Sequence, residues 1–81
     1  MTHYVYLIKS KSNNWFYVGL TINVESRLEQ HNLGFVISTK FYRPFELKFV
    51  QITNSITEAR NLEKYLKIRF NKESLLEILG I

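Results

Sequence analysis

The chain has 81 residues, no cysteine and a formal net charge of +4, and 46% of its residues are hydrophobic. This length predicts a single domain over residues 1–81, and the missing cysteines exclude a disulfide framework and a thiolate zinc site. With neither a secretion signal nor an apolar run near the roughly 20 residues of a membrane span, we expect a cytoplasmic protein, whose positive charge suits nucleic acid or serves solubility alone.

The N-terminal segment predicts a β-hairpin. Residues 4–9 are aromatic and branched without a polar interruption, which is typical of a central strand covered on both faces. A turn cluster at 11–14 precedes a second apolar run at 15–18, so the two runs should pair antiparallel. We expect Gly19 to end the second strand and to permit a bend.

A helix of about ten residues is predicted next. Asn23 is a good N-cap, and Gly34 is placed to end the helix at C′. Arg27 flanks the face that should dock on the sheet. The positions of that face recur at i, i+4 and i+7, and they are Val24, Leu28 and His31.

The segment after this helix is less regular. Residues 35–43 show no clear periodicity, which predicts a loop. Pro44 cannot donate to a strand ladder, so we expect the third strand to begin after it, at about 45–52.

Two helices are predicted in the C-terminal part. Ser55 and Glu58 have the spacing of a capping box, which predicts a helix from there to about Phe70. A short final helix should follow with Asn71 as its cap. Its apolar positions are Leu75, Leu76 and Leu79.

Glu63 is the least expected polar residue of the chain. At about 100° per residue it falls in the middle of the apolar stripe of its helix, which consists of Ala59, Leu62, Leu66 and Phe70. A buried carboxylate costs several kcal/mol unless it is paired or binds a metal. An ion pair with Arg27 or a nearby lysine and a metal-binding role both remain open.

Four more residues are candidates for chemistry. Tyr6 and Tyr17 lie on strands that should be neighbours, and a phenol can act in acid–base catalysis when its pKa is lowered. Arg27 is either a surface cation or the planar fork that a phosphodiester transition state requires. His31 is either a satisfied core histidine or a catalyst. The predicted topology brings all four, with Glu63, toward one end of the sheet.

Five segments follow one another in a recognisable order: Tyr4-Val5-Tyr6, Tyr17-Val18-Gly19, Arg27 with His31, Arg43-Pro44, and Glu63. Together they resemble the GIY-YIG nuclease superfamily, above all its small single-domain members. The resemblance extends from Tyr4 to about Phe70. It implies an α+β fold, with a small three-stranded antiparallel sheet flanked by helices in the order β-β-α-β-α-α.

The resemblance also implies an activity: the protein would be a metal-dependent endonuclease that hydrolyses phosphodiester bonds in DNA. Its cellular role would be in DNA repair or recombination. Tyr17 would be the general base, with Tyr6 and His31 positioning the water or taking the proton instead. Arg27 would stabilise the transition state. Glu63 would hold one Mg²⁺ or Mn²⁺ ion. The residues expected to contact DNA are Arg27, Lys40, Arg43, Arg60, Lys64 and Lys67, and Asn71 would match a further polar position of some members.

The chain departs from the family pattern at two positions. Tyr4 replaces the glycine of the first motif, and Leu20 stands where repair-nuclease members often place a basic residue. No separate DNA-binding domain is expected, so specificity should be low, structure-directed or supplied by a protein partner. Two alternatives stay open: a nucleic-acid-binding module with little turnover, and a docking domain with exposed aromatics at Trp15, Phe35 or Phe41.

Overall fold

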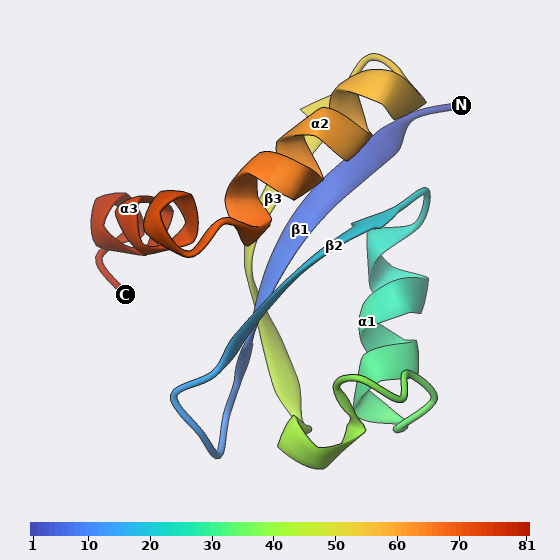
Figure 1. Cartoon of the computed structure of the whole chain (residues 1–81). Coiled ribbons are helices and arrows are strands. Elements are labelled where there is room, and N and C mark those ends of the chain that lie inside the picture. Colours follow the sequence, from blue (N-terminus) through green and yellow to red (C-terminus); the bar gives the residue numbers. More distant parts are fainter.

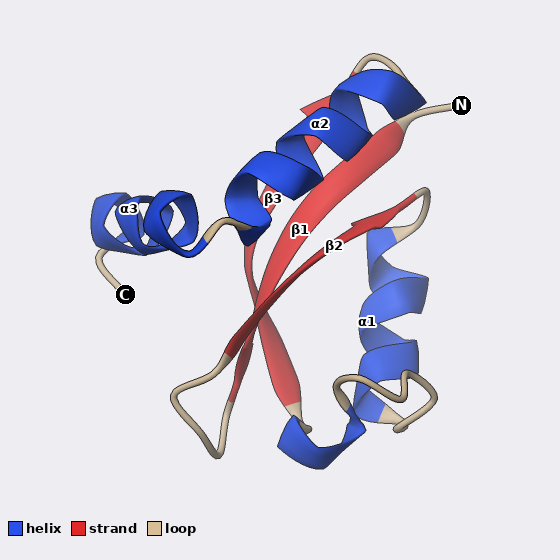
Figure 2. Ribbon diagram, viewed as in Figure 1, coloured by secondary structure: helices blue, strands red, loops and turns tan.

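The computed structural model describes residues 1–81 with the exception of the Phe70 side chain. A three-stranded antiparallel sheet carries helices on both faces (Figure 1, Figure 2), which confirms the predicted α+β class and element order. No helix among the described residues is long and apolar enough to span a membrane. The elements are β1 (His3–Ser10), β2 (Phe16–Thr21), α1 (Val24–Asn32), the 3₁₀-helix η1 (Lys40–Tyr42), β3 (Phe45–Thr53), α2 (Ile56–Lys67) and α3 (Arg69–Leu79).

β1 is the central strand of the sheet, whose order is β2-β1-β3. It pairs antiparallel with both neighbours, so that Tyr6 lies opposite Gly19 on β2 and opposite Val50 on β3. Its side chains alternate between two covered faces. This explains the uninterrupted apolar run of residues 4–8, which ends at Lys9, and it confirms the predicted central strand covered on both faces.

Each face of the sheet has its own hydrophobic cluster. On one face, strand residues such as Leu7 pack with Ala59 and Leu66 of α2, and α3 adds Leu75 and Leu76 at its edge. On the other face, Tyr6, Ile8 and Phe45 form a buried cluster against which Leu28 of α1 packs. The second face is richer in aromatic and polar groups, and it contains most of the candidate catalytic residues.

The amide of Asn32 attaches the end of α1 to the start of β3. Its Oδ1 accepts a hydrogen bond from the Phe45 N–H at 2.6 Å, and its Nδ2 donates to the Phe45 carbonyl at 3.3 Å. The α1 helix begins and ends as predicted, because Asn23 Oδ1 accepts from the Ser26 N–H and Gly34 takes φ +83°. The intervening loop contains the short helix η1, which the sequence did not predict.

The predictions for the C-terminal helices need correction. Ser55 caps α2 as predicted, but α2 ends at Lys67 and α3 begins at Arg69. Asn71 therefore lies inside α3 and is not its cap; its Nδ2 instead donates to the Tyr65 carbonyl at 2.9 Å. Phe70, which we predicted to complete the apolar stripe, lies outside the described side chains.

The sequence suggested that Gly19 ends the second strand, but Gly19 lies within β2. Its φ is not in the left-handed region, since Gly34 and Gly80 are the glycines with positive φ. A Cβ atom built on Gly19 would overlap Oη and Cζ of Tyr6. Gly19 is thus required because the Tyr6 ring occupies the space that a side chain would need.

We expect the substitution Gly19→Ala to lower the free energy of unfolding by about 1–3 kcal/mol, because the added methyl group overpacks a buried ring. Urea denaturation followed by circular dichroism measures the change. In a Tyr6→Ala background the same substitution should cost much less, since the clashing ring is gone. Equal costs in the two backgrounds would show that Tyr6 is not the reason for the glycine.

Candidate active site

The centre of the candidate site is a hydrogen bond between Tyr6 of β1 and His31 of α1. Tyr6 Oη and His31 Nε2 are 2.7 Å apart. The period of two along β1 directs Tyr6 to the α1 face, and the helical period of α1 turns His31 toward the sheet. Both side chains are buried, with 2% of Tyr6 and 0% of His31 exposed. The predicted docking of His31 on the sheet is therefore correct.

Tyr17 of β2 lies beside this pair. Its ring centroid is 6.4 Å from that of Tyr6 and 5.2 Å from that of His31. The ring is half-buried, and its hydroxyl has no hydrogen-bond partner among the described residues. Two phenols and an imidazole from three different elements thus converge, as the sequence predicted for neighbouring strands.

The aromatic surface continues from Tyr17 toward η1. Trp15 stacks on Tyr42 with ring centroids 4.1 Å apart and an angle of 11° between the planes. Trp15 is therefore half-buried, which contradicts its proposed role as an exposed docking residue. Phe35 and Phe41 are exposed, at 72% and 82%.

Arg27 of α1 contributes positive charge to the site. Its Nη1 donates a hydrogen bond to Gln30 Oε1 at 2.9 Å, and its side chain is half-buried.

Burial raises the pKa of Tyr6 to about 12, against an opposing effect of the Arg27 guanidinium. Burial, with a smaller contribution from Arg27, lowers the pKa of His31 to about 4. At neutral pH the site therefore contains a neutral phenol and a neutral imidazole next to a cation.

Glu63 reaches the site from α2, on the other face of the sheet. Its carboxylate pairs with Lys67 at 3.5 Å, and 23% of its side chain is exposed. Lys67 Nζ in turn lies 5.6 Å from the centroid of the Tyr17 ring, and the charge of Glu63 contributes to raising the pKa of Tyr6, after the larger effect of burial. Of the two readings of Glu63, an ion pair with a nearby lysine is present, and it places both charges beside the tyrosines.

A divalent cation would find one carboxylate here. Among the described residues, no group of three His, Cys, Asp or Glu side chains lies close enough to hold a metal ion. The donor set fits a cation that Glu63 holds together with phosphate oxygens and water, because Mg²⁺ is usually bound by one or two carboxylates and substrate phosphates. Lys67 would compete with the cation for Glu63.

The residues predicted to contact DNA do not form one continuous face. Arg60 and Lys64 are exposed on α2, whereas Lys40 and Arg43 lie at η1, and Figure 1 shows these two elements at opposite ends of the molecule. Arg43 Nη1 donates to the Lys40 carbonyl at 2.8 Å. Arg27 and Lys67 instead belong to the tyrosine site described above. Asn71, bound to Tyr65, makes no contact with that site among the described hydrogen bonds.

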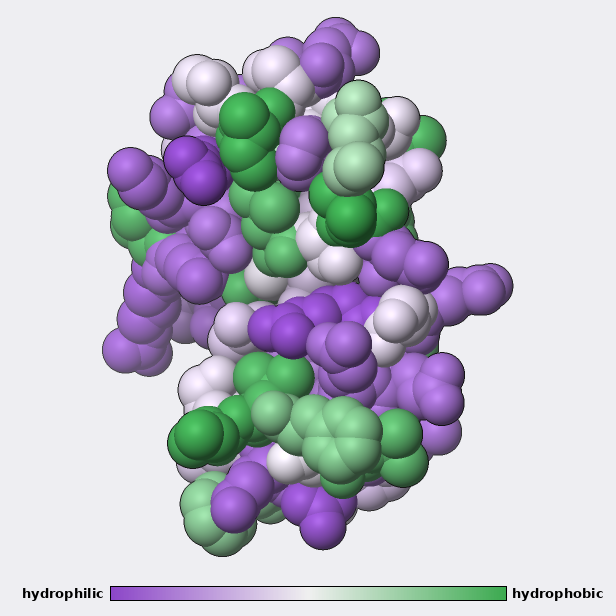
Figure 3. Space-filling view, turned by 90° about the vertical axis from the view of Figure 1, so that its right-hand side faces the viewer, coloured by the Kyte–Doolittle hydropathy of each residue, from purple (hydrophilic) through white to green (hydrophobic). Residues whose placement is uncertain are grey.

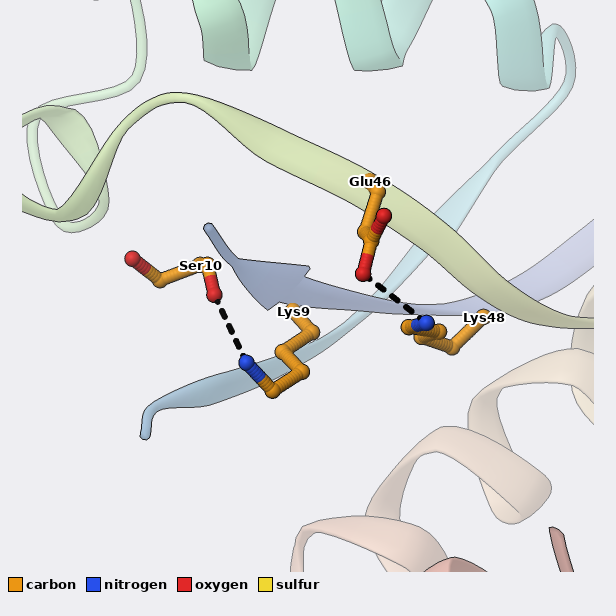
Figure 4. A network of polar contacts seen from close by, with 4 residues as sticks. All are labelled: Lys9, Ser10, Glu46 and Lys48. Atoms are coloured by element: carbon orange, nitrogen blue, oxygen red, sulfur yellow. Dashed lines mark hydrogen bonds and ion pairs between the residues drawn. The ribbon is translucent and has the colours of Figure 1, made fainter. Parts of the chain in front are cut away.

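A further basic group was not predicted. Lys9 donates to the Ser10 carbonyl, and Lys48 pairs with Glu46 at 2.8 Å (Figure 4). Lys48, with smaller effects of Lys11 and Lys9, holds the pKa of Glu46 below its usual value. These three lysines come from β1, the following turn and β3, so no local sequence pattern could group them.

Thr39 is the buried polar residue of the site that the sequence did not single out. It lies between α1 and η1, and its Oγ1 is 2.8 Å from His31 Nδ1. The segment around it lacks periodicity, so no sequence signal separated it from the exposed residues nearby.

The site is an open surface, since no pocket forms on the described part of the chain. On the α1 side of the molecule, a hydrophilic band crosses the middle of the surface, and apolar side chains gather both above and below it (Figure 3).

This fold and this arrangement of tyrosines, arginine, histidine and glutamate define a nuclease-type catalytic domain. The family described as GIY-YIG catalytic domain matches residues 2–75. The UPF0213 protein SH2523 of Staphylococcus haemolyticus is 37% identical over 78 residues, which cover 95% of this chain and 93% of that protein. YazA of Bacillus subtilis, another UPF0213 protein, is 36% identical over 77 residues, with 94% and 77% covered.

A solved structure has the same fold. The solution NMR structure of the UPF0213 protein BH0048 from Bacillus halodurans superimposes with a TM-score of 0.61 and 32% sequence identity, over 96% of this chain and 85% of that one. This chain belongs to the GIY-YIG family, and its relatives within that family are UPF0213 proteins.

The lowered pKa of His31 predicts how stability depends on pH. In the unfolded chain His31 binds a proton below its usual pKa of about 6.5, whereas in the folded chain it binds this proton only below about pH 4. The free energy of unfolding should therefore fall as the pH drops through this window, by up to about 3 kcal/mol, and it should not change above it on account of this group.

Urea denaturation at about pH 7 and about pH 5 measures this loss. The variant His31→Gln should lose most of the dependence, whereas His3→Gln is the matched control and should keep it. A His31→Gln variant with the full dependence would contradict the burial of a neutral imidazole.

Proposed function

We propose that this chain is a metal-dependent endonuclease that hydrolyses phosphodiester bonds in DNA. The observation that carries the proposal is the convergence of Tyr6, Tyr17 and His31 with Arg27 on one face, within reach of Glu63 and Lys67 from the other. General bases, a phosphate-binding cation and a metal-binding carboxylate are the parts that such a hydrolysis requires.

Proton removal from the attacking water is assigned to the Tyr6–His31 pair. A neutral phenol can take a proton only while it gives up its own. Tyr6 is the tyrosine whose hydroxyl is hydrogen-bonded to His31 Nε2, at 2.7 Å, and in the Nδ1–H tautomer of His31 this nitrogen is the acceptor. As the water oxygen attacks phosphorus, its proton passes to Tyr6 Oη and the Tyr6 proton passes to the imidazole. The phosphate charge near His31 favours this transfer, because a nearby anion raises the pKa of an imidazole.

Tyr17 and Arg27 orient the reacting groups. Tyr17 is the more exposed phenol and has a free hydroxyl among the described residues, so it holds the water beside Tyr6. Arg27 donates to the non-bridging phosphate oxygens, whose charge increases as the bond to the leaving sugar oxygen breaks. When bound at Glu63 and the phosphate, a divalent cation such as Mg²⁺ or Mn²⁺ supplies positive charge that stabilises the leaving oxygen.

The proposed substrate is DNA without a defined target sequence. The basic groups at the two ends of the molecule suit contacts with the phosphate backbone, which carry no sequence information. Specificity would then come from the structure of the DNA or from a protein partner, and repair or recombination is the cellular process that such an activity serves.

Incubation with supercoiled plasmid and Mg²⁺ or Mn²⁺ tests the proposal, with nicking measured on agarose gels. We expect Arg27→Ala and Tyr6→Phe each to lower the rate by about 10²–10³-fold. Glu63→Gln should abolish most of the metal-dependent rate. Glu58→Gln makes the same change at an exposed position of the same helix and should retain nearly full activity.

Wild-type protein that nicks no more than Glu63→Gln on supercoiled, single-stranded and branched DNA would overturn the proposal. Salt-dependent binding without nicking would instead identify a nucleic-acid-binding module.

The ion pair between Lys67 and Glu63 predicts an effect on metal affinity. Removal of the competing ammonium in Lys67→Met should tighten Mn²⁺ binding several-fold, because Glu63 loses its cationic partner. Titration followed by the electron paramagnetic resonance of free Mn²⁺ measures this without substrate. Lys64→Met removes the same charge one turn away and should change the affinity little; equal effects of both variants would exclude direct competition.

A further inference from the structure

Thr39 lies next to Nδ1 of His31, which is the ring nitrogen that is not hydrogen-bonded to Tyr6. Thr39 Oγ1 is 2.8 Å from His31 Nδ1, and Tyr6 Oη is 2.7 Å from Nε2. All three side chains are buried. They form a continuous hydrogen-bonded chain from the loop before η1, through α1, to the central strand.

The backbone around Thr39 holds its hydroxyl in place. The Thr39 N–H donates to the Val36 carbonyl at 3.1 Å, and the Thr39 carbonyl accepts from the Tyr42 N–H at 2.9 Å. The Thr39 hydroxyl has one proton, which it can donate to the same Val36 carbonyl at 3.4 Å. When the Thr39 proton is directed to Val36, the Thr39 oxygen can accept from His31 Nδ1.

The neighbours of Tyr6 indicate which atoms donate and which accept in the two hydrogen bonds that link Tyr6, His31 and Thr39. Arg27, Tyr17 and Glu63 also act on the Tyr6 hydroxyl. A guanidinium has donors only, and among the described residues the printed partner of Tyr6 Oη is His31 Nε2. If His31 Nε2 also donated to Tyr6 Oη, the buried Tyr6 proton would have no acceptor among the described residues. A buried donor without a partner is strongly disfavoured. This favours the arrangement in which the Tyr6 hydroxyl donates to Nε2 and the proton of His31 is on Nδ1.

We propose that Thr39 is a positioning residue: it holds His31 as the Nδ1–H tautomer and thereby sets the direction of the Tyr6 hydroxyl. In this state the Tyr6 proton is directed toward the imidazole, and the Tyr6 oxygen can accept a proton or a hydrogen bond from water. In the opposite tautomer, His31 would donate to Tyr6, whose own proton would face outward and could not be transferred to the ring.

The consequence of Thr39 for turnover rests on the proposed function, whereas its effect on the tautomer does not. Thr39→Val keeps the volume of the side chain and removes the acceptor for Nδ1–H. Thr39→Ser shortens the side chain and keeps the hydroxyl, so it is the matched control. Long-range ¹H–¹⁵N NMR of histidine-labelled protein, near neutral pH and without metal or nucleic acid, distinguishes the two neutral tautomers of His31 by the shifts of Nδ1 and Nε2.

We expect the Nδ1–H tautomer in the wild type and in Thr39→Ser, and a mixture or the Nε2–H tautomer in Thr39→Val. In the plasmid assay, Thr39→Val should lower kcat by at least about tenfold with KM little changed, a size typical of residues that orient a reacting side chain. Thr39→Ser should restore most of the rate.

An Nε2–H tautomer in the wild type would overturn the inference, even if Thr39→Val does not fold. An unchanged tautomer in folded Thr39→Val would overturn it as well. If no protein nicks DNA while the tautomer shifts as expected, the proposed function fails and the role of Thr39 stands. If the tautomer shifts and the wild type nicks DNA but Thr39→Val keeps full kcat, the role of Thr39 in turnover fails.

Discussion

The candidate site depends on the packing of the Tyr6 ring over Gly19. This packing brings the Tyr6 hydroxyl within hydrogen-bond distance of His31. The ring crosses from the central strand over the space of the missing Gly19 side chain and reaches the last turn of α1. Any Cβ at residue 19 would occupy the position of the ring. A close approach between two strands and a helix is therefore made possible by one glycine, and it brings the phenol and the imidazole together in the protein interior.

Burial gives this hydrogen bond its chemical character. Tyr6 keeps its proton because burial raises its pKa to about 12, and His31 stays neutral because burial lowers its pKa to about 4. Two neutral groups can share one proton in a fixed direction without the desolvation cost of buried charges. The charged members of the site, Arg27, Lys67 and Glu63, lie where side chains are partly exposed, and there solvent can support them.

The helix α2 connects the two faces of the sheet. It buries Ala59 and Leu66 against one face, while Lys67 reaches the ring of Tyr17, which belongs to the other. This is possible because β2 is an edge strand. The hydrophobic packing of α2 thus fixes the position of Glu63, so that stability and the proposed metal binding depend on the same helix.

The sequence by itself determined the order of the main strands and helices and the family. The apolar run of residues 4–9, the caps at Asn23, Gly34 and Ser55, and the period of α1 are local patterns, and local patterns are what a sequence displays directly. The order of the tyrosine motifs with Arg27, His31 and Glu63 led to the same family that the comparisons show. The tertiary structure alone decided the contacts between distant segments.

Gly19 looked like a turn residue because the sequence does not show the Tyr6 ring that lies over it. Thr39 looked like an ordinary loop residue because its partner, His31, lies on another element. Lys67 looked like one of several surface lysines of α2, although its ammonium lies 5.6 Å from the centroid of the Tyr17 ring on another element. In each case the role depends on which residue lies opposite in space, and the spacing along the chain does not contain that information.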